Sequence, residues 1–254
     1  MTELNNTKNP LKEVHKVLLS MMETIHHICK EHNIPYFISD GSLLGCIRHG
    51  GFIPWDDDID IGMLRKDYNH FKKVLKTSLP DIYKVETYKV RTHDKHNWLK
   101  IMYLEDFQWV DFEGKSHKGI SIDIFPYDYV PAKNQLSLPG RVFNRLSRIY
   151  YPKKINNPKL LAHFILNRLK LYNLYTPLNK ATKTITYGLE TPFYGWRFFD
   201  YDQIFPLKTG VFEGHEFNIP NNPDHFLSTV YGDYMRIPDE EERQIHMHNL
   251  QLSE

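Results

Sequence analysis

The chain has 254 residues, of which 41% are hydrophobic and 25% are charged, and this composition excludes disordered and fibrous proteins. No stretch approaches the roughly 18 consecutive apolar residues that a membrane span needs, and the first residues lack the layout of a signal peptide, so we expect a cytoplasmic protein. The formal net charge is +1, and the two cysteines, Cys29 and Cys46, are too few for a disulfide framework, so we expect buried thiols.

The first half of the chain has the patterns of a long helix followed by short strands. Apolar residues recur every three or four positions over 10–32, which predicts an amphipathic helix capped by Asn9. Buried strands are predicted over 34–39 and 58–63, a helix over 65–77, and further strands over 83–90, 97–105 and 119–125. These elements predict a mixed sheet with flanking helices.

A basic segment dominates the second half. Between Lys133 and Asp200, twelve Lys or Arg residues oppose two acids, so this segment has a net charge of +10 and the rest of the chain has −9. Helices are predicted over 138–150 and 160–174, strand-like spacing returns over 205–207 and 211–217, and a short helix is predicted over 222–230. Such a segment attracts phosphorylated glycans, nucleic acid or an acidic membrane; the alternative for each lysine is a solvated helical face.

These patterns together predict an α+β fold with a mixed β-sheet, flanking helices and a mainly helical basic insertion over about 133–200. Within it, four aspartates at positions 56–60 point to a metal site. In a strand, Asp58 and Asp60 lie on one face, roughly 7 Å apart, and the intervening isoleucines face the core. Carboxylates so placed repel each other unless a multivalent cation lies between them. Asp123 lies between isoleucines in another predicted strand, and three such acids are the hard oxygen ligands that Mg²⁺ or Mn²⁺ prefers.

Gly41 and Ser42 lie at a predicted strand-to-helix junction, where bare N–H groups and a hydroxyl suit a phosphate. Together with carboxylate-bound metal, this turn suits phosphoryl transfer. Arg48 and His49, at the end of the same helix, and Lys100, in a strand near the acids, are candidate phosphate ligands. Their alternative roles are capping the helix, pairing with an aspartate, and balancing charge.

The stretch 41–61 resembles the motif of the LicD/fukutin-type phosphotransferases, a family of the nucleotidyltransferase superfamily. The pattern is a Gly-Ser turn, an acid-apolar-acid strand and a later apolar-acid-apolar strand. These places are filled in order by Gly41-Ser42, Asp58-Ile59-Asp60 and Ile122-Asp123-Ile124. Three further stretches also resemble the family, namely residues 122–128, the motif Phe212-Glu213-Gly214 and residues 231–238. The resemblance spans about 11–248, and it is weakest in the basic segment.

The resemblance implies one catalytic domain over 1–254 with a nucleotidyltransferase-like sheet. It implies Mg²⁺ or Mn²⁺ held by Asp58, Asp60 and Asp123, one of which also acts as the base. The implied donor is a CDP-linked alcohol such as CDP-choline or CDP-ribitol, whose phospho-alcohol half passes to a hydroxyl of a surface glycan such as lipopolysaccharide while CMP leaves. The family often ends in a similar Arg and His arrangement, which makes Arg243 and His246 candidates for substrate contact.

Surface glycans are assembled on lipid carriers, so we expect a glycan acceptor that is lipid-linked and peripheral contact of the basic segment with the inner face of the membrane. Nucleic acid is not an expected partner. The sequence leaves open which alcohol is carried, which glycan accepts it, how many ions bind and the oligomeric state.

Other interpretations use the same residues. An EF-hand-like calcium loop starting at Asp56 is disfavoured because its sixth position is Ile61 where glycine is required. An NTP-dependent nucleotidyltransferase would use the same aspartates, and a non-catalytic protein that binds anionic glycans or nucleic acid would need only the basic segment. Trp55 is expected in the core, with stacking on a nucleobase or headgroup as the alternative.

Overall fold

The computed structural model describes residues 9–86, 98–131, 173, 177–178, 180–189, 197–243 and 245–252. Apart from residue 173, the helices predicted over 138–150 and 160–174 lie outside this part of the chain. Its elements, in order, are α1 (Pro10–Glu31), β1 (Phe37–Ile38), α2 (Asp40–His49), β2 (Ile59–Leu64), α3 (Arg65–Ser78), β3 (Tyr83–Glu86), β4 (Leu99–Val110), β5 (Ser116–Tyr129), η1 (Lys180–Thr182), β6 (Thr184–Tyr187), β7 (Phe199–Asp200), α7 (Tyr201–Ile204), β8 (Lys208–Phe212), β9 (His215–Ile219), α8 (Pro223–Tyr231), η3 (Glu240–Glu242) and β10 (His248–Leu252).

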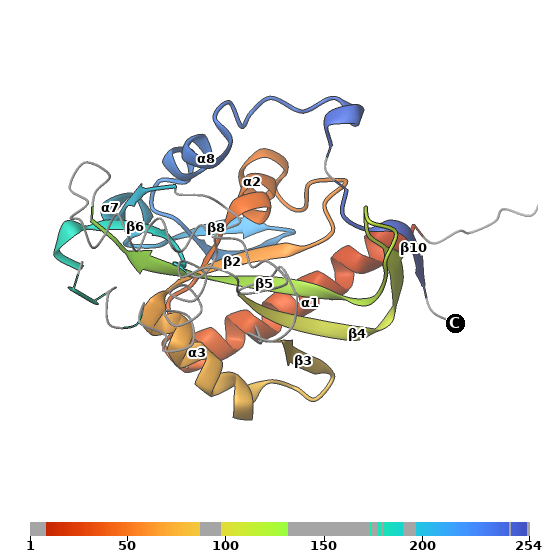
Figure 1. The fold of residues 1–254 in the computed structure, drawn as a ribbon, viewed down its shortest axis with the longest axis horizontal. Helices are drawn as coiled ribbons and strands as arrows, with labels where there is room; N and C mark the ends of the chain where they lie inside the picture. The colour runs from red at the N-terminus through yellow and green to blue at the C-terminus, as the bar shows by residue number, and fades with distance from the viewer. Residues whose placement is uncertain are drawn as a thin grey trace, which may run out of the picture.

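The described strands form one mixed sheet and one separate hairpin (Figure 1). The sheet has the order β1-β2-β5-β4-β10, with β3 also on β4, β6 on β5, and β7 on β6. β2 and β5 are parallel, whereas the other pairs are antiparallel. β8 and β9 form the antiparallel hairpin. The predicted α+β class is therefore confirmed.

Helix α1 covers the sheet along β5 as far as β10 (Figure 1). It begins as predicted, because the Asn9 side chain accepts a hydrogen bond from the Leu11 N–H at 3.1 Å and Pro10 occupies the first turn. One face of the helix is buried, namely Val14, Leu18, Met21, Met22, Ile25, Ile28 and Cys29. This face meets the isoleucines of β2 and β5 in one core, which fixes the sheet that carries the acids.

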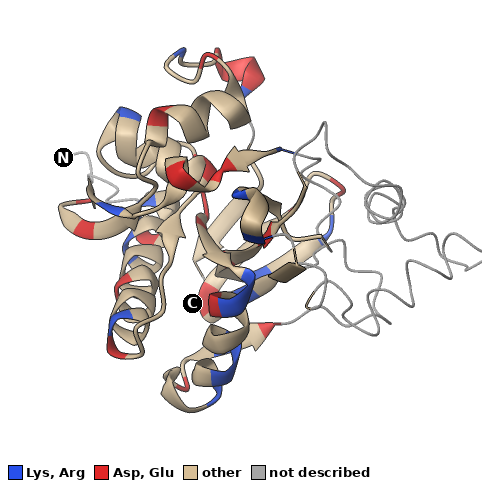
Figure 2. Ribbon diagram, turned by 90° about the vertical axis from the view of Figure 1, so that its left-hand side faces the viewer, with Lys and Arg blue, Asp and Glu red and all other residues tan. Residues whose placement is uncertain are grey.

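Helix α3 follows β2 without a loop and is amphipathic, as its spacing predicts. Tyr68, Phe71, Val74 and Leu75 are buried. The outer face is basic, as Figure 2 shows along this helix, while the acids of η3 gather at the opposite end of the molecule. Among the described residues, no helix has the length and apolarity that crossing a membrane requires. Both cysteines are buried free thiols, as predicted, and burial raises the pKa of Cys46 to about 11.

Three local predictions differ from the structure. The strand-like segment 205–207 is a loop after α7, where Pro206 offers no N–H to a ladder. The segment 211–217 is two strands joined at Glu213 and Gly214, whose φ angles of 52° and 79° form a tight turn with the geometry of a type I′ hairpin. The strand β6, which extends the sheet from inside the basic segment, was not predicted, because that segment was expected to be mainly helical.

Candidate active site

Three charged side chains form a row across the middle of the sheet. The register places Asp60 of β2 directly opposite Asp123 of β5, and Asp123 directly opposite Lys100 of β4. Residues opposite each other on neighbouring strands share a face, so the three side chains are close neighbours. Asp58 lies immediately before β2, two positions before Asp60. The negative charge of Asp123 contributes to raising the pKa of Asp58. The predicted juxtaposition of these acids on adjacent strands is therefore present.

The carboxylates of this cluster repel one another in a buried setting. Burial, followed by the charge of neighbouring acids, raises the pKa of Asp58 and of Asp60 well above the ordinary range. Burial and the adjacent Asp57 raise the pKa of Asp56 to about 7. A protein keeps so many acids together at a cost in stability, and a divalent cation relieves that cost.

The absence of a side chain at Gly41 lets the backbone lie close to the carboxylates. A Cβ at this position would lie 2.9 Å from Asp56 Oδ2 and 3.7 Å from Asp60 Oδ2, so a side chain would fill the space in front of the two carboxylates. Asp56, which our candidate set did not include, thus faces the same space as Asp60. A group of carboxylate oxygens that face one space fits a hard divalent ion. The residues that would hold Mg²⁺ or Mn²⁺ are Asp56, Asp58 and Asp60, with Asp123 beside them.

Asp123 is held by several donors. Lys100 Nζ lies 2.7 Å and 2.8 Å from its two oxygens, and the indole N–H of Trp98 donates to Oδ2 at 2.7 Å. The Ser121 hydroxyl adds a contact of 3.3 Å to Oδ1. These bonds fix the orientation of the carboxylate and place the lysine ammonium next to the acids, where it can also meet a phosphate.

Ser42 connects the Gly-Ser turn to the acidic strand. Its hydroxyl accepts a hydrogen bond of 2.8 Å from the backbone N–H of Asp60, and the side chain is buried. The Ser39 N–H in turn donates to the Asp60 carbonyl at 3.0 Å. These two bonds hold the start of α2 against β2, which keeps Gly41 in front of the carboxylates. A role of Ser42 in phosphate binding stays a prediction.

A second buried acid, Asp40, lies just before this turn. Its backbone has a φ of 46°, which is unusual for a residue other than glycine, and its Oδ1 accepts a hydrogen bond from the Tyr187 hydroxyl of β6. Burial raises the pKa of Asp40 to about 6. The strand β6, which the sequence did not predict, thus reaches the acidic cluster through Tyr187.

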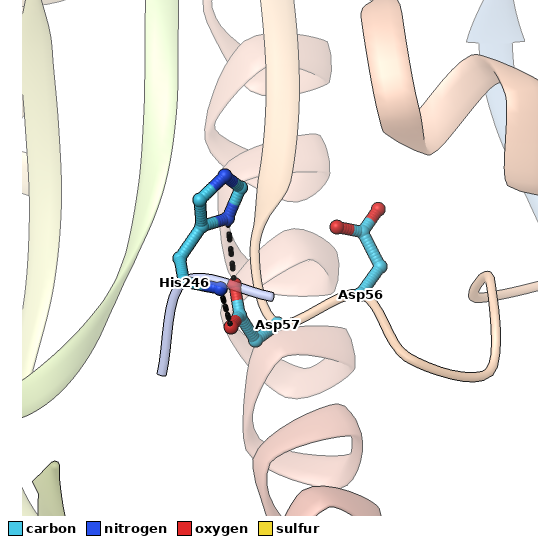
Figure 3. A group of neighbouring side chains, drawn as sticks. All are labelled: Asp56, Asp57 and His246. Carbon is cyan, nitrogen blue, oxygen red and sulfur yellow. Dashed lines mark hydrogen bonds and ion pairs between the residues drawn. The ribbon is translucent and has the colours of Figure 1, made fainter. Parts of the chain in front are cut away.

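Asp57 ties the C-terminal segment to the acidic run (Figure 3). Its buried carboxylate accepts hydrogen bonds from the backbone N–H groups of His246, at 3.2 Å, and Met247, at 2.8 Å. It also lies 3.2 Å from His246 Nδ1. The hydrogen bond with Asp57, together with the charge of Asp58, raises the pKa of His246 to about 9. One potential ligand atom from each of Asp56, Asp57 and His246 lies within 4.8 Å of the other two, so His246 lies at the edge of the cluster.

Trp55, the residue before the acidic run, is half-buried between two of the candidate residues. The guanidinium carbon of Arg243 lies 4.3 Å from its ring centroid, and the His49 ring meets it edge-on with centroids 6.3 Å apart. The tryptophan packs against the core, as expected. One ring face is therefore covered by Arg243, and this residue reaches the acidic run through Trp55.

Arg48 binds backbone carbonyls. It donates through Nη1 to the carbonyl oxygens of Tyr234, at 2.8 Å, and Arg236, at 3.0 Å, and through Nε to His49 Nε2 at 3.0 Å. These bonds hold residues 234–236 against the end of α2. The structure thus places Arg48, His49 and Arg243 in a second group beside Trp55, and phosphate binding by them stays a prediction.

Of the site residues that were not predicted, only Asp56 lies in a sequence pattern that could have identified it. Asp56 has the same alternation as Asp58 and Asp60, so the pattern contained it. Asp57 has no such signal, because its partners lie 189 and 190 positions away. Tyr187 also had none, because it lies in a segment read as helical.

The chain is similar in sequence to known transferases. A family model described as "LicD/FKTN/FKRP, nucleotidyltransferase domain" matches residues 33–173. The chain is 28% identical over 258 residues to lipopolysaccharide cholinephosphotransferase LicD of Haemophilus influenzae, covering 94% of this chain and 96% of that protein. It is 42% identical over 41 residues to human ribitol 5-phosphate transferase FKRP, covering 16% of this chain and 8% of that protein.

Proposed function

Because the chain belongs to the LicD/FKTN/FKRP family of nucleotidyltransferase domains, we propose that it is a metal-dependent phosphotransferase acting on a glycan. The proposed donor is a CDP-linked alcohol, with choline favoured by the name of the relative that matches 94% of this chain. The phospho-alcohol half passes to a hydroxyl of a cell-surface glycan precursor, and CMP leaves. The single observation that carries this proposal is the row of Asp60, Asp123 and Lys100 across three adjacent strands.

The cluster divides into residues that hold an ion and residues that meet the phosphate. In this proposal Asp56, Asp58 and Asp60 hold Mg²⁺ or Mn²⁺, which when bound supplies charge neutralisation for the donor phosphates. Asp123, oriented by Lys100 at 2.7 Å and by Trp98, stands beside them, and one of the aspartates takes the proton of the acceptor hydroxyl. Lys100 and the N–H groups of the Gly41 turn are placed to meet phosphate oxygens.

The direct test replaces Asp58 or Asp60 by Asn. Each substitution removes one charge while keeping the size of the side chain, so we expect the fold to persist and turnover of CDP-choline to be lost, by roughly a factor of 100 or more for a group acting on the transferred phosphate. Far-UV circular dichroism monitors the fold, and Asp81→Asn, at an exposed loop position, is the matched control. Near-normal turnover in both variants would remove the proposal.

A second enzyme class shares the aspartates. An NTP-dependent nucleotidyltransferase would transfer the nucleoside monophosphate itself and release pyrophosphate, so the products distinguish the two classes. A non-catalytic protein that binds anionic glycans would not need a metal ion bound by these aspartates. Titration of the protein with Mn²⁺ by calorimetry separates that class from both enzymes.

A further inference from the structure

The segment 50–56 leads from the end of α2 into the acidic run, and two distant elements hold it. Its first residues meet the β8–β9 hairpin, and its last residue meets α1. Segment 50–56 carries Asp56 at its end, so its path decides where the first carboxylate of the cluster lies. Neither of these contacts has a part in the chemistry proposed above.

Glu213, at the turn of the hairpin, makes two bonds to segment 50–56. Its Oε1 accepts a hydrogen bond of 2.9 Å from the Phe52 N–H, and its own N–H donates to the Gly50 carbonyl at 2.9 Å. The residue has a φ of 52° at the turn of the hairpin, and the bond from the Phe52 N–H shows that its side chain points toward the segment. At Gly51, a Cβ would lie 2.0 Å from Glu213 Oε1, and its three nearest neighbours are all atoms of the Glu213 side chain. The segment and the glutamate are therefore fitted to each other.

His15 of α1 holds the same segment from the other side. Its ring is parallel to that of Phe52 with centroids 4.1 Å apart, and Phe212 packs edge-on against Phe52 at 4.8 Å. Its Nε2 lies 2.7 Å from the Asp56 carbonyl oxygen. A carbonyl only accepts, so this nitrogen donates. Phe52 is thus clamped between α1 and the hairpin, and the backbone of Asp56 is bonded at the end.

We infer that Glu213 is a positioning residue, which holds segment 50–56 so that the Asp56 and Asp60 carboxylates converge in front of Gly41. This inference rests on the proposed function, because it concerns the divalent-ion site. It gives a role to the motif Phe212-Glu213-Gly214, which the chemistry of the cluster leaves unexplained. Partners that orient metal ligands typically contribute about 10- to 100-fold to metal affinity.

The test measures Mn²⁺ affinity of the purified chain, without substrate, by electron paramagnetic resonance. We expect Glu213→Ala to weaken Mn²⁺ binding roughly 10-fold or more, and Glu213→Gln to restore most of it because the amide oxygen still accepts from the Phe52 N–H. Gly51→Ala should reproduce the loss, because its methyl group expels the glutamate carboxylate. In the double variant, Gly51→Ala should add little to Glu213→Ala, because the side chain it displaces is already gone.

Two control variants separate positioning from general loss of stability. Glu216→Ala removes an exposed acid of the same hairpin, and Ile219→Val lowers the packing of β9 without touching segment 50–56. Both should bind Mn²⁺ as the parent chain does. If Glu213→Ala does not fold, Glu213→Gln against Gly51→Ala carries the comparison.

Three results would overturn the inference. Unchanged Mn²⁺ affinity in Glu213→Ala and Gly51→Ala would do so, as would additive losses in the double variant or equal losses in Ile219→Val. A parent chain that binds no Mn²⁺ would contradict the metal-dependent function as well as this inference. The failures of the two proposals are thus distinguishable.

Discussion

Replacing Asp56 by Asn should stabilise the metal-free protein at neutral to alkaline pH. Burial, and then the charge of Asp57, raises the pKa of Asp56 from 3.8 to about 7. In the interval between these values the unfolded chain has lost the proton and the folded chain keeps it, so stability falls as pH rises. The loss of stability begins near the pKa of Asp56 in the unfolded chain and is complete above its pKa in the folded chain. Asparagine cannot ionise and escapes this loss.

The magnitude follows from the width of the interval. A difference of about 3 pKa units, at about 1.36 kcal/mol each, sets an upper limit of about 4 kcal/mol for the gain at about pH 8. Because neighbouring acids share the repulsion, a gain of about 2–4 kcal/mol is expected there, with almost none at about pH 4. The assay is urea unfolding in the presence of a chelator at both pH values, with Asp81→Asn as the surface control.

Added Mn²⁺ should reverse the order of stability. An ion that binds only the folded protein stabilises it, and it should stabilise the parent chain more than Asp56→Asn because the variant lacks one ligand. A raised pKa of Asp56 is refuted if the variant, in the presence of chelator, is no more stable than the parent at about pH 8. A parent stability that stays flat from about pH 4 to 8 would refute it equally.

Three further predictions concern other parts of the chain. Asp128→Asn removes the negative charge that the buried Arg65 binds through two hydrogen bonds of 2.8 Å and 2.6 Å, so unfolding in urea should show a loss of about 3–5 kcal/mol. An unchanged midpoint would contradict a stabilising role of this ion pair. Asp57→Ala should cost about 1–3 kcal/mol and lower the pKa of His246 from about 9, and an NMR titration that still gives about 9 would count against the tie between them. Charge reversal in the basic segment replaces Arg145, Arg148, Lys153 and Lys154 by Glu. It should reduce sedimentation with anionic liposomes at low salt, and it should lower activity on a lipid-linked acceptor more than on a soluble sugar. Equal losses on both acceptors would show that this segment serves the fold or the active site.

Much of the acidic cluster could be predicted because its signal is local. Alternation in 58–61 and in 122–124 identifies two buried strands whose acids share a face, and the observed register sets Asp60 opposite Asp123. The long helix α1 and its Asn9 cap are also local patterns, which is why both were predicted correctly. Lys100 was placed near the acids by its strand, and the register puts it opposite Asp123.

The remainder depends on contacts between distant parts of the chain. No pattern near Asp57 indicates that its oxygens accept from residues 246 and 247. The turn at Glu213 was read as the middle of a strand, because apolar residues flank it at 211–212 and at 217. The positive φ of a non-glycine residue also cannot be recognised from the residue type alone. β6 is four residues long, and a segment that short acquires strand character only by pairing with β5.

The most direct test of the central claim is product analysis with radiolabelled CDP-choline, Mg²⁺ and a glycan acceptor, with other CDP-alcohols in parallel. We expect release of CMP together with label in the glycan, and loss of both in Asp60→Asn. Release of pyrophosphate from an NTP, with every CDP-alcohol left intact, would contradict it.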